Sequence, residues 1–286
     1  MIVHLNGELV GAEQASISPL DRGFLFGDGV YEGLRAFMGR VVAMDRHVAR
    51  LARGLEATGI RFDAALMPRI AASLLEANGL CDAFIYVQVT RGTPGPGQPP
   101  RDRVPGPEIR PTVFAFCTPQ PDLESYRSVP TRSARILPDQ RWLLGRIKST
   151  SLLGNVLASL EADRLGAQDA VLVRDGLVAE ATGSNVLLAL PEPGGRAQIV
   201  TPALENPPIL DGVTRTMLIE SIPEIVERPV RVEELAAASE VMLAGSITML
   251  SAVTGLDGRP VGDGQPGPIA SRLLHTLVRT IESEHE

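Results

Sequence analysis

Lys148 is the only lysine in this chain of 286 residues. The other 26 of its 27 lysine and arginine residues are arginine. A guanidinium stays protonated at any ordinary pH, whereas a desolvated ammonium can lose its proton and act as a nucleophile or a base. A neutral lysine amine adds to carbonyl groups and forms Schiff bases. The alternative is that a compositional bias replaced the other lysines and left this one by chance. The residues that accompany Lys148 must therefore distinguish a chemical role from chance.

Pyridoxal phosphate (PLP) is one carbonyl compound that such a lysine binds, and its phosphate requires partners of its own. Backbone N–H groups at a helix N-terminus and an arginine side chain suit a phosphate. The stretch GVTRTMLIE is a glycine turn that enters a predicted helix, so the amides of Val213 and Thr214 are candidates. The stretch LAGSIT offers a second Gly-Ser turn, and Arg50 lies on a predicted helix. Each feature is weak alone, because a glycine before a helix is usually only a turn.

The pyridine nitrogen of PLP requires a carboxylate that holds it protonated, so that the ring can take up electrons. Glu180 lies in the predicted strand GLVAEATGSN, where Val178 and Glu180 share one face. Glutamates on strands generally face solvent. An acidic residue among apolar neighbours nevertheless predicts an inward-pointing carboxylate, and Glu180 is the candidate for this role.

Seven motifs occur in the order seen in class IV aminotransferases, the fold-type IV PLP enzymes that include D-amino-acid and branched-chain aminotransferases. The segment around Lys148 and the 32-residue step to Glu180 (180 − 148) most resemble D-amino-acid aminotransferase. The resemblance covers nearly the whole chain and rests on GDGVYEGLR (27–35), HVARL (47–51), VTRG (89–92), RWLLGRIKSTSLLGN (141–155), EATGSN (180–185), GVTR (212–215) and GSIT (245–248).

The resemblance implies a role for each matching residue. Lys148 matches the Schiff-base lysine, and Glu180 matches the carboxylate that pairs with the pyridine nitrogen. The family fold is two α/β domains with PLP between them, in a homodimer whose sites borrow a loop from the partner. Tyr31 matches the tyrosine that lies close to the cofactor and the substrate. The residues that match the phosphate contacts are Arg50, Val213, Thr214 and Ser246.

One loop departs from the family pattern. D-alanine-type enzymes usually carry an Arg-x-His pair after VTRG that binds the substrate α-carboxylate, but the loop TPGPGQPPRDRVPG (93–106) contains no histidine. Arg101 or Arg103 is the candidate to replace that pair. The stretch YEGLR, by contrast, is similar to FEGLR of the branched-chain enzymes.

The resemblance implies a PLP-dependent aminotransferase that moves the amino group of a D-amino acid, of the D-alanine or D-glutamate type, to a 2-oxo acid by a ping-pong mechanism. Four alternatives stay open from the sequence. They are a branched-chain L-amino-acid aminotransferase, an (R)-selective amine transaminase, an aminodeoxychorismate lyase, and a non-catalytic PLP-binding or scaffold protein.

The elements that carry these motifs alternate between strands and helices, which predicts an α/β protein with domains at 1–118 and 132–286 and a linker at 119–131. In the first domain we expect hairpins around Asn6-Gly7 and residues 38–40, helices at 44–59 and 64–78, and two strands flanking the 93–106 loop. In the second we expect strands at 133–138, around Asp175-Gly176, at 199–204 and at 240–247, and helices after Lys148, at 213–221, at 230–237 and from 269.

The composition excludes several classes of protein. The net charge of −7 argues against electrostatic binding to nucleic acid. No apolar run approaches the length that spans a membrane, and MIVHLNGELV lacks the pattern of a signal peptide. The four scattered histidines predict no metal site. Cys81 and Cys117 are expected to be reduced core residues, which favours a cytoplasmic protein.

Overall fold

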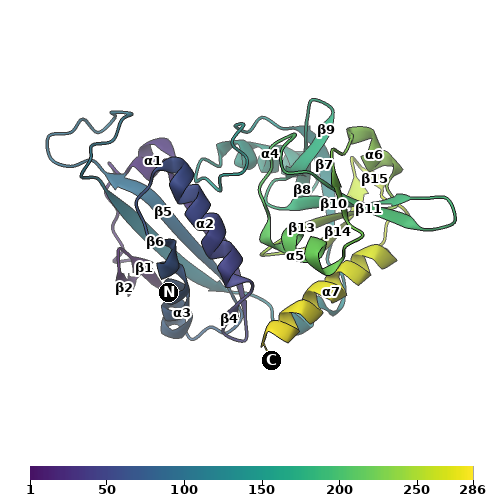
Figure 1. The fold of residues 1–286 in the computed structure, drawn as a ribbon, viewed down its shortest axis with the longest axis horizontal. Coiled ribbons are helices and arrows are strands. Elements are labelled where there is room, and N and C mark those ends of the chain that lie inside the picture. The colour runs from purple at the N-terminus through teal and green to yellow at the C-terminus, as the bar shows by residue number, and fades with distance from the viewer. Residues whose placement is uncertain (286) are drawn as a thin grey trace. The chain divides into compact units, whose positions relative to one another are not determined.

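The computed structural model describes residues 1–285, which form two compact units (Figure 1). The first unit comprises residues 1–122 together with the short segment 147–152, and the second comprises residues 123–146 and the chain from 153 onwards. Each unit contains one β-sheet with helices packed on it, so the expected α/β fold class is confirmed.

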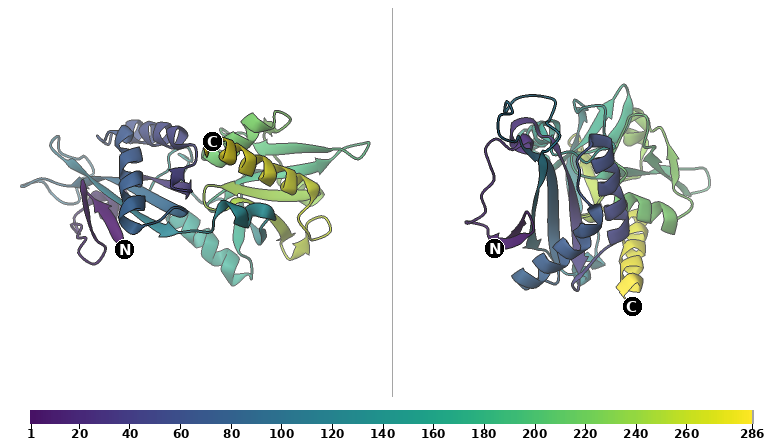
Figure 2. Two further views of the ribbon diagram at one scale, coloured as in Figure 1. Left: turned by 90° about the horizontal axis from the view of Figure 1, so that it is seen from below. Right: turned by 60° about the vertical axis from the view of Figure 1, so that its left-hand side comes forward.

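The first unit is a six-stranded antiparallel sheet with two helices on one face (Figures 1 and 2). The hairpin predicted around Asn6-Gly7 is confirmed, because β1 and β2 pair antiparallel on either side of it. The strand order is β2 (Glu8–Gly11), β1 (Ile2–Leu5), β6 (Arg110–Pro119), β5 (Ala83–Thr93), β3 (Gly29–Phe37) and β4 (Arg40–Val41), and the helices are α2 (Met44–Thr58) and α3 (Met67–Asn78).

The two faces of this sheet differ in character. On the helix-covered face, alternate strand residues such as Val30, Leu34 and Ile85 pack into the apolar core of the unit. On the opposite face, the rings of Tyr31, Tyr86, Phe116 and Phe114 form a half-buried row with neighbouring centroids 5.3, 5.3 and 5.9 Å apart. Because side chains alternate along a strand, β3 directs Tyr31 to the aromatic face and its neighbour Glu32 to the helices.

The second unit is a nine-stranded mixed sheet with an apolar core between the sheet and its helices. Helix α7 (Pro268–His285) packs on α5 (Val213–Ser221) and on β14 (Met249–Leu256) (Figure 1). The other elements are β7 (Thr131–Pro138), α4 (Leu153–Arg164), β8 (Asp169–Arg174), β9 (Leu177–Ala181), β10 (Asn185–Pro191), β11 (Ala197–Pro202), β12 (Val226–Arg228), α6 (Val232–Ala237), β13 (Glu240–Gly245) and β15 (Arg259–Pro260).

Several local expectations were wrong. The short helix α1 (Arg22–Phe26) was not predicted; the Asp21 carboxylate caps its N-terminus, and Gly27 ends it in the left-handed conformation. The helix expected at 64–78 opens with the 3-10 turn η1 (Ala64–Leu66), and the one expected at 230–237 begins at Val232. Strand β14 was missed, because its first five residues are all buried and show no alternation.

The predicted linker at 119–131 is partly helical, and one of the two cysteines lies outside the core. The predicted linker contains the 3-10 helix η2 (Leu123–Arg127), and the two units divide at residue 122 within it. Cys117 is buried, but Cys81 is exposed, because it follows the glycine-capped end of α3 in a bend. Among the helices of residues 1–285, none combines the length and apolar character that crossing a membrane requires.

Candidate active site

The segment that carries Lys148 lies alongside β3 in the first unit. The Lys148 carbonyl accepts a hydrogen bond of 2.9 Å from the Tyr31 amide, and the Thr150 amide donates to the Gly29 carbonyl over 3.0 Å. Two backbone hydrogen bonds therefore fix the main chain on both sides of Ser149, and Lys148 is held beside the start of β3.

The Lys148 side chain extends over Tyr31 on the aromatic face of the sheet. Its Nζ atom lies 3.3 Å from the Tyr31 hydroxyl oxygen and 4.3 Å from the centroid of the ring. An ammonium in this position is attracted by the ring electrons. The tyrosine hydroxyl can accept a hydrogen bond from Nζ, or donate one to Nζ when the amine is neutral. The pair thus places a hydroxyl where a proton can be held at the amine.

Arg50, the predicted phosphate ligand, forms a buried cluster with Glu32 and His47. Arg50 Nε and Nη2 donate to the two Glu32 carboxylate oxygens over 2.8 and 2.7 Å, and His47 Nδ1 lies 2.8 Å from Glu32 Oε2. Burial acts to raise the pKa of Glu32, but the charge and hydrogen bonds of Arg50 and the contact with His47 outweigh it and lower that pKa to about 2. Glu32 therefore remains ionised and fixes the guanidinium plane.

We expect Glu32→Gln to destabilise the protein most at neutral pH. The folded-state pKa of Glu32, about 2, is below its ordinary value of 4.5, so its stabilisation is fully present above pH 4.5 and lost as the pH falls towards 2. The difference corresponds to about 3 kcal/mol in the free energy of unfolding. Urea unfolding at pH 7, 5 and 3 measures it, with the exposed Glu56→Gln as control. A Glu32→Gln penalty that did not shrink below pH 4.5 would contradict this assignment.

Glu180 lies on β9 in the second unit and is buried, as the sequence predicts. Its Oε1 atom accepts a hydrogen bond of 2.5 Å from Arg141 Nη1. Its Oε2 atom accepts bonds of 3.2 Å from the Asn185 side-chain amide and from the backbone N–H of Leu210. This carboxylate is therefore held in place by donors on both oxygens.

Arg141 is itself locked by Asp139, a pair that sequence reasoning missed. Arg141 Nε and Nη2 donate to the two Asp139 oxygens over 2.8 and 3.0 Å, and Arg174 Nη2 donates to the Arg141 carbonyl over 2.6 Å. Burial acts to raise the pKa of Asp139, but hydrogen bonding to Arg141 and the charges of both arginines keep that pKa below its ordinary value. The Arg141 guanidinium is thus oriented before it meets Glu180.

The N-terminus of α5 contributes the amides of Val213 and Thr214. Its N-cap residue, Gly212, provides no side-chain acceptor for the amides of the first turn. A Cβ atom at Gly212 would lie 1.8 Å from Asn185 Oδ1, so a larger residue here would displace the Asn185 side chain. Uncapped amides at a helix N-terminus suit a phosphate.

Ser246 belongs to the turn that follows β13. Strand β13 pairs with β10 so that Ala244 lies opposite Asn185, which is the residue that contacts both Glu180 and Gly212. The second unit therefore gathers Glu180, the start of α5 and the turn containing Ser246 around the beginning of β10.

The remaining predicted residues, Arg101 and Arg103, lie in the loop between β5 and β6. The Arg101 guanidinium stacks over the Phe26 ring at 5.0 Å. The candidate residues thus divide between the units: Lys148, Tyr31, Arg50, Arg101 and Arg103 in the first, and Glu180, Val213, Thr214 and Ser246 in the second. Within residues 1–285, no group of His, Cys, Asp and Glu side chains could hold a metal ion.

Comparison with known proteins identifies the family. The family model described as amino-transferase class IV matches residues 29–256. The chain belongs to the class IV aminotransferases. A D-alanine aminotransferase from Bacillus licheniformis is 34% identical over 292 residues, covering 99% of this chain and 98% of the relative.

Other class IV aminotransferases resemble the chain as well. A Methanocaldococcus jannaschii protein, whose provisional name is branched-chain-amino-acid aminotransferase, is 33% identical over 96% of this chain and 94% of its own. The solved branched-chain aminotransferase of Thermoproteus uzoniensis with norvaline superimposes with a TM-score of 0.85 at 25% identity, covering 100% of this chain and 96% of that one. The expected fold-type IV architecture is confirmed.

Class IV aminotransferases depend on PLP. The residues present fit this cofactor: a lysine whose amine lies beside a tyrosine hydroxyl, a helix N-terminus without a side-chain cap, and a buried carboxylate with donors on both oxygens. PLP is therefore the cofactor of this protein, and an amino donor and a 2-oxo acid are its substrates.

Proposed function

We propose that this class IV aminotransferase transfers the amino group of a D-amino acid, of the D-alanine or D-glutamate type, to a 2-oxo acid by a ping-pong mechanism. The observation that carries the proposal is the Lys148 amine 3.3 Å from the Tyr31 hydroxyl, in a chain 34% identical to a D-alanine aminotransferase over nearly its full length. A cytoplasmic location and a homodimeric state belong to the same proposal.

PLP, when bound, supplies the electrophilic carbonyl and the electron sink of the reaction. Lys148 would hold the cofactor, and its amine, when free, would move the substrate proton. The Tyr31 hydroxyl lies within hydrogen-bonding reach of that amine. It can therefore orient Nζ while the proton is transferred.

The other residues of the proposed site bind and polarise. Glu180, which accepts a hydrogen bond from Arg141, would hold a proton at the pyridine nitrogen. Arg50 and the first amides of α5, with Ser246, would bind the phosphate. Because Glu32 fixes the Arg50 guanidinium and Asp139 fixes that of Arg141, both cations are oriented in advance.

Helix α4 supports the homodimer. Leu153, Val156, Leu157 and Leu160 recur at helical spacing and are 69%, 48%, 52% and 60% exposed. They form one apolar stripe, and such a stripe on a surface marks an interaction site. A second copy of the chain is the partner that we propose for it.

We expect D-alanine or D-glutamate to bleach the yellow holoenzyme faster than L-leucine does. Bleaching reports the amino-donor half-reaction directly, before any acceptor is added. The sequence around Lys148 resembles the D-specific enzymes more than YEGLR resembles the branched-chain ones. Stopped-flow absorbance with D-alanine, D-glutamate and L-leucine at equal concentrations measures the order of rates.

The branched-chain aminotransferase reading is the second candidate, favoured by the Thermoproteus uzoniensis structure and the Methanocaldococcus jannaschii relative. If L-leucine bleaches the enzyme faster than both D-amino acids, this candidate replaces ours. Adding (R)-1-phenylethylamine to the same series tests an amine transaminase. A protein that no donor bleaches would be a lyase or a PLP-binding scaffold.

A further inference from the structure

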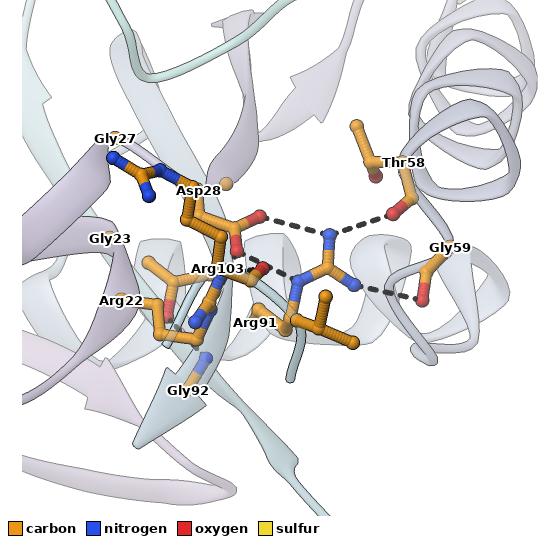
Figure 3. A network of polar contacts seen from close by, with 12 residues as sticks. Arg22, Gly23, Gly27, Asp28, Thr58, Gly59, Arg91, Gly92 and Arg103 are labelled. Atoms are coloured by element: carbon orange, nitrogen blue, oxygen red, sulfur yellow. Dashed lines mark hydrogen bonds and ion pairs between the residues drawn. The ribbon is translucent and has the colours of Figure 1, made fainter. Parts of the chain in front are cut away.

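Asp28 is the centre of a charged cluster that the proposed chemistry does not use (Figure 3). It is the aspartate of the GDG motif that precedes β3, and it accepts hydrogen bonds from two arginines. Arg22 Nε donates to its Oδ2 over 2.8 Å, while Arg91 of the VTRG motif donates to both oxygens over 2.8 and 3.0 Å. The side chains of Arg22, Asp28 and Arg91 are only 6%, 16% and 16% exposed. These three residues form the Asp28 cluster.

The two arginines direct their remaining N–H groups to backbone carbonyls in two different segments. Arg91 donates to the carbonyls of Thr58 and Gly59, at the C-terminal end of α2, over 2.7 and 3.2 Å (Figure 3). Arg22 donates to the carbonyls of Asp102 and Arg103 over 2.5 and 3.1 Å. One carboxylate therefore joins the end of α2 to the tip of the 93–106 loop through two oriented guanidinium groups.

The chemistry of the cluster favours a fixed geometry. Both contacts to the loop are charge-assisted and come from a single planar guanidinium, so they restrain the direction of two consecutive carbonyls. Burial acts to raise the pKa of Asp28, but hydrogen bonds from Arg91 and Arg22 outweigh it and keep that pKa below its ordinary value. The carboxylate thus stays charged and the restraint persists over the working range of pH.

The loop presents its two arginine side chains differently. Arg101 stacks on the Phe26 ring at 5.0 Å, and Arg22 lies over the same ring at 4.8 Å. The Arg103 carbonyl is held by Arg22, and its exposed side chain makes no hydrogen bond or ion pair within residues 1–285. Arg103 is therefore the arginine of the loop that is available to a carboxylate, while Arg101 is engaged with the protein.

The cluster also borders the lysine segment. Asp28 immediately precedes Gly29, whose carbonyl accepts the Thr150 amide, and the Gly27 carbonyl accepts the Thr150 hydroxyl over 2.9 Å. The same turn before β3 therefore anchors the segment of Lys148 and, through Arg22, the loop of Arg103.

We propose that Arg22, Asp28 and Arg91 form a positioning cluster that fixes the 93–106 loop so that the Arg103 side chain binds the substrate α-carboxylate. The assignment of a carboxylate substrate rests on the proposed function, whereas the restraint on the loop rests on the contacts alone. Arg22 is a positioning residue, and it acts through Arg103.

The decisive experiment is a double-mutant cycle between Arg22→Lys and Arg103→Ala. Lysine keeps the charge but cannot span Asp28 and two carbonyls. We expect Arg103→Ala to lower kcat/KM for the D-amino acid donor about tenfold to a hundredfold, mainly through KM. Arg22→Lys should raise KM about tenfold with kcat within twofold. If Arg22 acts through Arg103, adding Arg22→Lys to Arg103→Ala changes kcat/KM less than twofold further.

Hydrogen exchange of the purified holoenzyme gives a second readout that does not require turnover. The Asp102 amide donates to the Pro99 carbonyl and the Val104 amide to the Asp102 side chain, so peptides covering 99–104 report the loop tip. We expect Arg22→Lys to speed their exchange at least about tenfold. Arg61→Lys is the matched control, because Arg61 holds the carbonyls of Pro107 and Ile109 at the other end of the loop.

The outcomes separate the two proposals. Unchanged exchange at 99–104 in Arg22→Lys, or a cycle in which the two KM effects multiply, overturns the positioning cluster. Arg101→Ala raising KM more than Arg103→Ala overturns the choice of arginine. If no amino donor bleaches the wild-type protein, the proposed function fails, and exchange alone still decides whether Arg22 holds the loop.

Discussion

Lys148→Arg is expected to yield a colourless protein that does not transaminate. The change conserves the positive charge, but a guanidinium does not give up its proton to become a nucleophilic amine. It removes the nucleophile and the proposed proton carrier together, so we expect the half-reaction rate to fall on the order of 10³-fold or more. The measurement is the visible absorbance after dialysis, with borohydride reduction to test for a remaining imine.

The neighbouring sequence offers a matched control for Lys148. Arg146 is exposed, with its side chain 61% accessible, and it pairs with Glu205 on the surface. The double variant Arg146→Lys/Lys148→Arg keeps one lysine two residues away and leaves the net charge unchanged. It should be as colourless as the single variant, whereas Arg146→Lys alone should stay yellow. A Lys148→Arg protein with a borohydride-reducible chromophore would refute the role of Lys148.

Glu180→Gln should retain PLP but slow proton transfer on the order of 10²- to 10⁴-fold. A neutral amide cannot hold a proton at the pyridine nitrogen, so the ring becomes a poorer electron sink. The carboxamide is nearly the same size as the carboxylate, and its oxygen can still accept from Arg141. The bond to Arg141 is therefore kept, whereas the charge and the two 3.2 Å bonds that Oε2 accepts from Asn185 and Leu210 are lost, because an NH2 group cannot accept them.

Two measurements distinguish the effect of the Glu180 charge from general damage. Cofactor content by absorbance should match the wild type, while the deuterium isotope effect with α-deuterated donor should increase as proton transfer becomes limiting. Glu192→Gln changes an exposed carboxylate in the same unit and should leave both unchanged. Wild-type turnover in Glu180→Gln would show that its pairing with the pyridine nitrogen is wrong.

Local pattern in the sequence indicated several candidate site residues. The strand alternation that buries Glu180 and the glycine that opens α5 act within a few residues, and the structure has both in the expected elements. Lys148, expected in the domain 132–286, instead belongs to the first unit, because its segment pairs with β3. Their partners could not be predicted in this way. Glu180 meets Arg141 across 39 residues and Arg50 meets Glu32 across 18, because sheet register and helix packing decide which side chains approach.

The partners within the Asp28 cluster lie even farther apart in the sequence, so local pattern could not predict them either. Its bonds join Asp28 to Arg91 across 63 residues, and Arg22 to Asp102 across 80. The motifs GDG and VTRG were visible in the sequence, but no periodicity indicates that they meet or that a second arginine, Arg22, joins them. Helix α1 was missed for a related reason, since five residues are too few to show a helical pattern and its caps alone define it.

The six residues 147–152 belong to the first unit although the chain on both sides of them belongs to the second. The first unit is consequently completed only after residues 123–146, the start of the second unit, have been synthesised. A fragment ending at residue 122 would lack Lys148 and would leave the Tyr31 amide at the sheet edge without its acceptor, the Lys148 carbonyl. Lys148 and the segment that bridges β3 through Ser149 are therefore one piece of chain, and the first unit is complete only once that piece has been made.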